Sequence, residues 1–230
     1  MRAKDLILVL KRIPHKDHTF VLDTLSRTEG RKSFILRAGL TKAGKRHRAL
    51  AAPMQLLQVE YLASKSGWAR ILHMHPEIFY RRLHADPRRT AMGLFMIENI
   101  RQLVREGHSE DMFDRFADFF IRLDREPYRP GFHLEFMSAM LEILGIKPQP
   151  GEFGTFFDRE NDMKDLRLQE IFPDAGQRAL FLRFLAGDAM KNRAERREVL
   201  QLTGRYVAFH YGDYRLPKTL EVYKEVFDEE

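Results

Sequence analysis

The sequence predicts an α+β protein in which a small five-stranded barrel is followed by an all-helical domain. Two observations concern the apolar residues, which alternate with polar ones in the first third of the chain and recur every three or four residues from residue 86 onward. The third is charge: residues 1–82 hold 17 Lys+Arg against 6 Asp+Glu, whereas the rest holds 22 against 27. The spacing of the apolar residues and the net charge of the chain therefore change at nearly the same position, near residues 80–86.

Five short apolar runs in the first third are expected to be strands. They cover residues 6–11, 19–25, 33–37, 56–62 and 68–72. Turns at Gly30 and Gly67 join two pairs of them, and residues 39–48 are too polar and charged to pack, so we expect a long loop there. Five short strands with tight turns fit a small closed barrel, of which the OB fold is the commonest kind.

The remainder of the chain is predicted to be helical. Apolar faces at helical spacing place helices near residues 92–104, 112–123, 132–144, 173–186 and 194–211, with a last one from about residue 217. Proline and glycine make residues 148–172 irregular. We therefore expect an OB domain at residues 1–80 and a helical domain at 81–230 with an irregular insert at about 148–172.

A dense group of cations marks the predicted barrel as a nucleic-acid binder. No acidic residue lies between Arg31 and Arg48. The cations of this stretch are Arg31, Lys32, Arg37, Lys42, Lys45, Arg46 and Arg48. Phe34 and Trp68 lie on the same barrel and could stack on bases, although a place in the barrel core is the alternative for Phe34. Cations that follow phosphates and rings that stack on bases are typical of single-strand binding.

The motifs of catalysis are incomplete, so we expect a protein that is not an enzyme and has no cofactor or metal. Residues 39–46 resemble a phosphate-binding P-loop, but Arg46 stands where a Ser or Thr must bind magnesium. His73 and His75 alternate on a predicted strand, yet no third metal ligand follows at a known spacing. The chain has no cysteine, which excludes thiolate zinc sites and disulfides.

The helical domain offers one candidate partner site. Arg193, Arg197 and Arg205 share one side of a predicted helix by their spacing, and they could flank an apolar groove that accepts a peptide. The sequence has neither a secretory segment nor a membrane-spanning stretch, so we expect a cytoplasmic protein.

The order of these segments resembles the RecO family of DNA repair proteins. The matching runs are residues 7–11, 19–22, 28–34, 37–39, 56–61, 196–200 and 218–222. No single run is diagnostic, but together they extend over nearly the whole chain. Some family members carry a four-cysteine zinc module, which this cysteine-free chain cannot form.

The resemblance implies a DNA repair and homologous recombination mediator. Such a protein binds single- and double-stranded DNA, anneals complementary strands and associates with the nucleoid. Its implied partners are the C-terminal tail of single-stranded DNA-binding protein and RecR, with which it helps RecA to load. Three alternatives remain from the residues alone: an RNA-binding OB module, a hydrolase with a metal at His73 and His75, and a protein adaptor that binds no nucleic acid.

Overall fold

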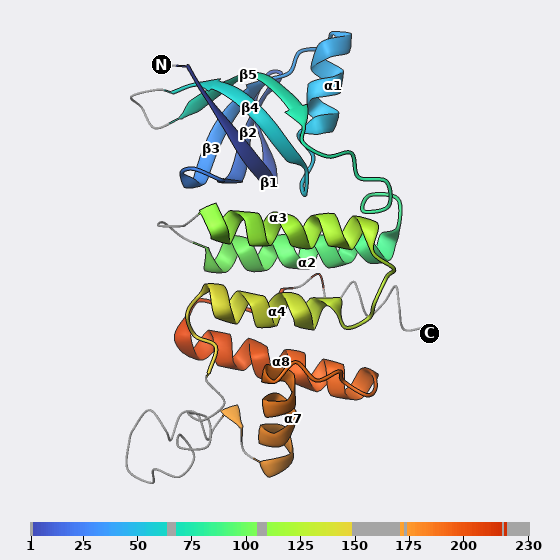
Figure 1. The fold of residues 1–230 in the computed structure, drawn as a ribbon. Coiled ribbons are helices and arrows are strands. Elements are labelled where there is room, and N and C mark those ends of the chain that lie inside the picture. Colours follow the sequence, from blue (N-terminus) through green and yellow to red (C-terminus); the bar gives the residue numbers. More distant parts are fainter. Residues whose placement is uncertain are drawn as a thin grey trace. The chain divides into compact units, whose positions relative to one another are not determined.

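A computed structural model of the chain confirms the α+β class, with an N-terminal barrel followed by helices (Figure 1). The structure describes residues 2–63, 68–104, 110–148, 171–172, 174–217 and 219. By its contacts the chain divides into two units, Met1–Pro127 with Lys218–Glu230, and Tyr128–Pro217. The barrel thus shares a unit with the two helices that follow it, whereas the sequence prediction ended the first domain at residue 80.

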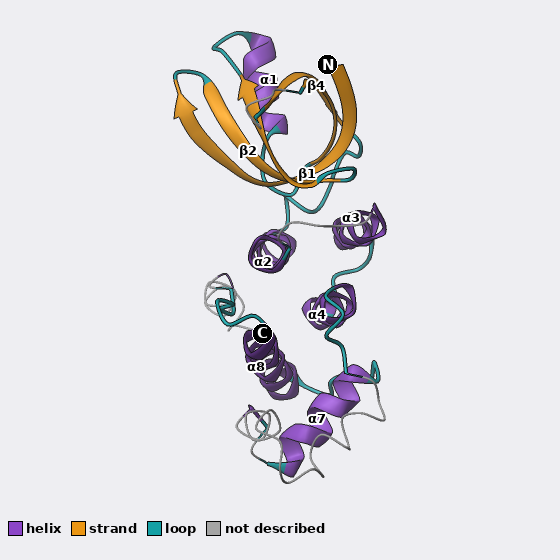
Figure 2. Ribbon diagram, turned by 90° about the vertical axis from the view of Figure 1, so that its left-hand side faces the viewer, coloured by secondary structure: helices purple, strands orange, loops and turns teal. Residues whose placement is uncertain are grey.

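The barrel has the strand order of an OB fold. Its strands are β1 (Arg2–Lys16), β2 (Thr19–Ser26), β3 (Gly30–Arg37), β4 (Leu56–Leu62) and β5 (Ala69–Pro76). They close in the order β1-β2-β3-β5-β4, because the long β1 pairs with β4 through its first half and with β2 through its second. The short parallel pairing of β3 with β5 completes the ring. Figure 2 shows the ring of strands. The prediction of an OB fold is confirmed.

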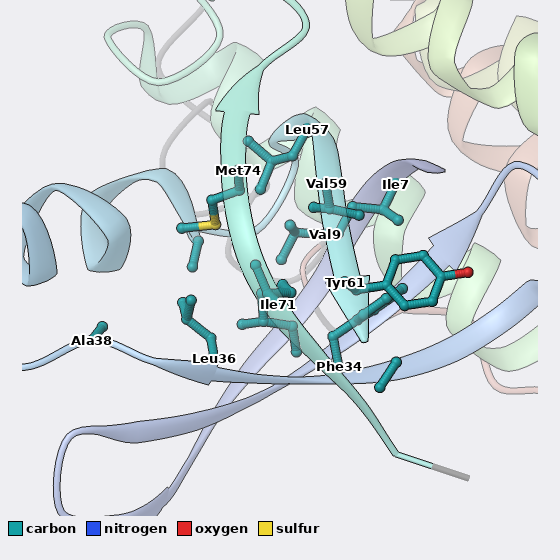
Figure 3. Packing of buried hydrophobic residues seen from close by; sticks show 13 residues of the cluster. Ile7, Val9, Phe34, Leu36, Ala38, Leu57, Val59, Tyr61, Ile71 and Met74 are labelled. Carbon is teal, nitrogen blue, oxygen red and sulfur yellow. The ribbon is translucent and has the colours of Figure 1, made fainter. Parts of the chain in front are cut away.

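Inward-pointing side chains fill this barrel, as Figure 3 shows. Phe34 and Tyr61 meet edge to face within this cluster, with ring centroids 5.1 Å apart. The cluster comprises Ile7, Val9, Leu22, Phe34, Leu36, Ala38, Ala51, Leu57, Val59, Tyr61, Ala69, Ile71 and Met74. Burying one such large side chain stabilises the fold by about 1.5–3 kcal/mol. Because small barrels are filled in this way, a ligand of this domain is expected on its outside.

The predicted loop at residues 39–48 is wrong, since a helix, α1 (Lys42–Leu50), begins inside it. Thr41 caps the helix, and its hydroxyl accepts a hydrogen bond from the Gly44 N–H at 3.2 Å. Leu50 and the following Ala51 pack on the barrel core, while the lysines stay exposed. A single packed side is enough to hold a short helix, so the high charge of the segment did not prevent helix formation.

Gly44 lets α1 approach the end of β3 closely. A Cβ at this position would lie 2.0 Å from the carbonyl oxygen of Gly39. Because this oxygen belongs to the backbone, relieving the clash would require the main chain to shift. Gly44, one of the two glycines that resemble a P-loop, therefore has a structural explanation. It makes room for the backbone of Gly39.

We expect Gly44→Ala to lower the free energy of unfolding by about 1–3 kcal/mol, the usual cost of overpacking a tight site. Urea denaturation measures the change. The matched control is Gly39→Ala, whose Cβ would meet nothing within 4 Å and should leave the midpoint in place. Equal stability of the two variants would contradict the close approach.

Helices α2 (Pro87–Leu103) and α3 (Glu110–Arg125) are tied to the barrel by arginines. Arg31 of β3 donates to the carbonyl oxygens of Arg101 and Val104 at the C-terminal end of α2, at 3.1 and 3.4 Å. Arg27, next to β2, donates two 2.8 Å hydrogen bonds to the Asp114 carboxylate on α3. Cations at a helix C-terminus and opposite an acid are both favourable, so these contacts fix α2 and α3 to one end of the sheet.

The second unit is built from three described helices around an aromatic cluster. Phe181 lies between Phe172 and Tyr206, with ring centroids 4.8 and 5.6 Å away. The Tyr206 hydroxyl donates to the Ile146 carbonyl oxygen at 2.8 Å. The helices are α4 (Phe132–Ile143), α7 (Ala175–Leu185) and α8 (Arg193–His210).

Two sequence predictions lie wholly or mostly outside the described residues. These are the irregular insert at about 148–172 and the last helix from about residue 217. Among the residues that the structure describes, none of the helices has the length and apolar character needed to cross a membrane.

His133 on α4 gives the second unit a pH-dependent stability. Burial lowers the pKa of its imidazole to about 4, because the charged form would lose its hydration. The unfolded chain therefore takes up the proton at a higher pH than the folded one. The contribution of His133 to stability is full above about pH 6.5 and is lost as the pH falls toward 4, by on the order of 3 kcal/mol.

The expected outcome is that His133→Leu, which has no ionisable group, loses less stability between pH 7 and pH 4.5 than the wild-type protein. Urea unfolding of both proteins at the two pH values, followed by circular dichroism, measures the difference. Parallel losses would mean that the buried imidazole does not control this dependence.

Candidate nucleic-acid interface

A row of apolar side chains crosses the outside of the barrel. Ile13 of β1 lies opposite Val21 of β2, which in turn lies opposite Ile35 of β3. Ile35 is paired with Arg70 of β5. Directly opposed residues share one side of a sheet, and their neighbours in sequence point into the core, so this row faces outward. Ile13 is 39% exposed, so this end of the row is open to solvent.

Cations border this apolar row. Lys16 lies opposite Thr19, and Thr19 opposite Arg37, which places both cations on the outward side next to the row. Lys16, Arg37 and Arg70 are exposed, and in the part of the chain that the structure describes none of them forms an ion pair. We use the name outer face for this surface, whose residues are Lys11, Ile13, His15, Lys16, Thr19, Val21, Ile35, Arg37, Trp68 and Arg70.

Trp68 closes the outer face beside Arg70. Its indole is 42% exposed and meets the imidazole of His15 edge to face, with centroids 5.7 Å apart. His15 belongs to the β1–β2 hairpin and Trp68 directly precedes β5, so the contact joins the two connections that flank the face. In OB folds, oligonucleotides bind on the face of strands two and three between these same connections. The predicted stacking residue Trp68 is thus available to a ligand.

Arg31 is held by the protein's own groups, although the sequence predicted it to contact DNA. Its guanidinium makes hydrogen bonds of 2.8 and 2.9 Å to the Asp23 carboxylate, and Arg101 of α2 approaches the same carboxylate at 3.3 Å. With its two bonds to the end of α2, Arg31 has a structural role. Asp23 precedes Arg31 by eight residues, so it lies outside the acid-free run between Arg31 and Arg48 but pairs with its first member.

Lys32 faces inward at one mouth of the barrel and is also unavailable. Its side chain is only 13% exposed, pairs with Glu29, and lies over the rings of Tyr61 and Phe34, with Nζ 4.4 and 5.4 Å from their centroids. Hydrogen bonds from Lys32 and from the Tyr61 hydroxyl lower the pKa of the Glu29 carboxyl below its ordinary value. This group closes the barrel end.

The prediction that Phe34 could stack on a base is not supported by its place in the fold. Its exposed fraction is 0% and its ring packs against Tyr61 in the core. A base could reach the ring only if the barrel opened. The alternative that the sequence left open, a core position, describes it correctly.

The four remaining predicted cations lie on α1. Lys42, Lys45 and Arg46 are exposed, and their spacing of three and four residues puts them on one side of the helix. Arg48 is half-buried and donates to the Gly39 carbonyl oxygen at 3.3 Å. The predicted group therefore does not form one site, because its members divide between β3 and α1.

Eight of the ten residues of the outer face lie outside the predicted set, namely Lys11, Ile13, His15, Lys16, Thr19, Val21, Ile35 and Arg70. A signal for Lys11, Ile13 and His15 was present, since they alternate along a basic strand end. Lys16 joins the face only through the register shift between Pro14 and Lys16. Arg70 could be found only from the pairing of β3 with β5.

The predicted partner residues Arg193, Arg197 and Arg205 are all exposed on α8. The start of this helix is fixed to α7, because Glu195 pairs with Arg183 at 3.3 Å. Their role in binding a peptide stays a prediction.

The two histidines weighed as metal ligands lie apart from any third ligand in the described residues, where no group of three His, Asp or Glu side chains could hold an ion. His73 and His75 are exposed on β5, and His75 hydrogen-bonds to the side chain of Gln58 at 3.0 Å.

Comparison with known proteins gives a consistent result over almost the entire chain. No family model matches. Curated proteins described as DNA repair protein RecO do: that of Bacteroides fragilis is 26% identical over 99% of this chain and 100% of its own length. The Phocaeicola vulgatus protein is 25% identical with the same coverage, and the Porphyromonas gingivalis protein is 27% identical over 96% of this chain and 97% of its own. The resemblance seen in the sequence is confirmed.

Because Arg31 and Arg37 lie on the same side of β3 but differ in their partners, their alanine variants should behave differently. Arg31→Ala is expected to lower the free energy of unfolding by roughly 1–3 kcal/mol, since it removes hydrogen bonds to a half-buried carboxylate and to helix carbonyls. Arg37→Ala should change stability by less than about 0.5 kcal/mol, as is usual for an exposed side chain. Thermal unfolding measures both, and equal losses would mean that the assignment of partners is wrong.

Proposed function

We propose that this chain, a member of the RecO family of DNA repair proteins, binds single-stranded DNA on the outer face of its barrel. The observation that carries the proposal is the register of β1, β2, β3 and β5. That register gathers an apolar row, an exposed indole and unpaired cations on one side of the sheet.

Each part of the outer face suits one part of a DNA strand. Lys16, Arg37 and Arg70 offer charges to the phosphates, and neutralising phosphates releases bound counterions. Trp68 offers a ring for a base, and stacking of this kind is worth about 1–3 kcal/mol per base. The aliphatic row between them gives further bases an apolar surface. Such contacts do not depend on base identity, so we expect little sequence preference.

The remaining activities follow from this binding and need no bond-making chemistry. Cations between two strands reduce their mutual repulsion, which favours annealing of complementary strands. We include in the proposal that the protein is not an enzyme, that it works at the nucleoid, and that with RecR it helps RecA to load on DNA coated by single-stranded DNA-binding protein. The exposed arginines 193, 197 and 205 of α8 are the candidate contact for the acidic tail of that coating protein.

A binding titration tests the proposal. The variant with Lys16→Ala, Arg37→Ala and Arg70→Ala should bind labelled oligo(dT) more weakly, and the slope of log K against log salt should become shallower by about 2, which corresponds to three lost phosphate contacts. Fluorescence anisotropy at four salt concentrations gives both values. Trp68→Ala should weaken binding while leaving the slope in place.

The matched control removes three exposed cations outside the barrel, with Arg81→Ala, Arg125→Ala and Lys191→Ala. It has the same net charge as the first variant and should keep the wild-type slope. If the two triple variants lose affinity alike, only overall charge matters and the outer face is not the site. A protein that binds matched RNA more tightly than DNA would favour an RNA-binding module instead.

A further inference from the structure

The exposed side of α1 forms a second cationic surface, separate from the outer face. The exposed positions of this helix are Lys42, Ala43, Lys45, Arg46 and Ala49. Three of the five are cations, and in the described part of the chain none of the three pairs with an acid. We use the name α1 face for Lys42, Lys45 and Arg46.

The sheet separates the α1 face from the outer face. Arg12 of β1 lies opposite Leu22, whose side chain is in the core, so Arg12 points to the inner side of the sheet. From there its guanidinium donates to the Arg48 carbonyl oxygen at the end of α1 and lies over the Phe20 ring, 5.4 Å from the centroid. The helix therefore packs over one end of the barrel, beside the β1–β2 hairpin and β5, and not among the outward-pointing residues (Figure 2).

The opposite orientation of the two surfaces follows from this packing. Leu50 and Ala51 turn one side of α1 toward the barrel core, and Lys42, Lys45 and Arg46 lie on the exposed side. The residues of the outer face leave the sheet in the other direction, because they alternate with the core residues. A single strand that contacts the apolar row cannot at the same place lie against α1.

The two surfaces also differ in chemistry. The outer face combines cations with an indole and an aliphatic row, which can hold bases as well as phosphates. On the α1 face, the exposed positions beside the cations are alanines, which offer no ring for stacking. This surface can recognise the phosphate backbone but has little to hold a base.

We propose that the α1 face binds the phosphate backbone of a second DNA strand while the outer face holds the first, so that one molecule carries two strands at once. The inference rests on the proposed function and extends it from one strand to two. Two strands bound to one protein meet at a high effective concentration, and the cations of both surfaces offset their repulsion. The strand on α1 keeps its bases free to pair.

A co-occupancy experiment tests this inference directly. Two populations of oligo(dT), labelled with a donor and an acceptor dye, cannot pair with each other, so energy transfer between them reports two strands on one particle. They are mixed with an equimolar amount of the full chain. The variant is Lys42→Ala, Lys45→Ala and Arg46→Ala, and the charge-preserving control is Lys42→Arg, Lys45→Arg and Arg46→Lys.

We expect the alanine variant to bind a single oligo(dT) within about 3-fold of the wild-type affinity, because the outer face is intact. Its energy transfer should fall by roughly 10-fold, because the second, linked site has been removed. The control should keep both signals. All three positions are exposed, and thermal unfolding checks that the variants fold alike.

Two results would overturn the inference. If energy transfer survives in the alanine variant, the second strand lies elsewhere or on a second copy of the protein. If single-strand affinity falls in step with energy transfer, the two faces form one continuous site. Failure of the proposed function itself has a different signature, which is that the wild-type protein does not bind a single oligo(dT).

Discussion

The parallel pairing of β3 with β5 is the contact on which the rest of the first unit depends. It consists of the pairs Phe34 with Ala69 and Ile35 with Arg70. The first pair closes the barrel around its core, and the second brings Arg70 and the adjacent Trp68 to the side of Ile35. A shift of one residue would turn these side chains to the opposite side of the sheet. The same register between β3 and β5 therefore closes the barrel and forms the proposed interface.

Ion pairs within the protein divide the cations into two kinds. Arg27 and Arg31 bind carboxylates or helix ends, and Lys32 is enclosed by Glu29 and two rings. The two arginines attach α2 and α3 to the barrel, and Lys32 closes the barrel mouth. Arg37, Lys42, Lys45 and Arg46 are exposed in the described structure without such partners. Fewer of the predicted cations are therefore available to a polyanion than the sequence suggested. Those that are available lie on the outer face and on the α1 face.

The two proposed faces offer a way for the chain to act on DNA by binding alone. Single-strand binding needs bases and phosphates to be held together, which the outer face can do. Annealing needs a second strand whose bases are free, and a surface that holds only phosphates provides this. Because the residues of the two faces lie on different elements, a substitution on one face leaves the residues of the other in place.

Side-chain periodicity and charge are local properties, so the strands, the helices after the barrel and the change from basic to acidic composition could be predicted from the sequence. The OB fold and the helical part followed from them. The three-dimensional structure was needed to show which cations are paired, since Asp23 and Arg101 are 78 residues apart and Arg27 and Asp114 are 87 apart. It also showed that residues 42–50 form a helix and that Arg70 joins the outer face. Strand register and ion pairs join residues whose separation along the chain carries no periodic signal, whereas α1 is held by the packing of one side on the barrel core.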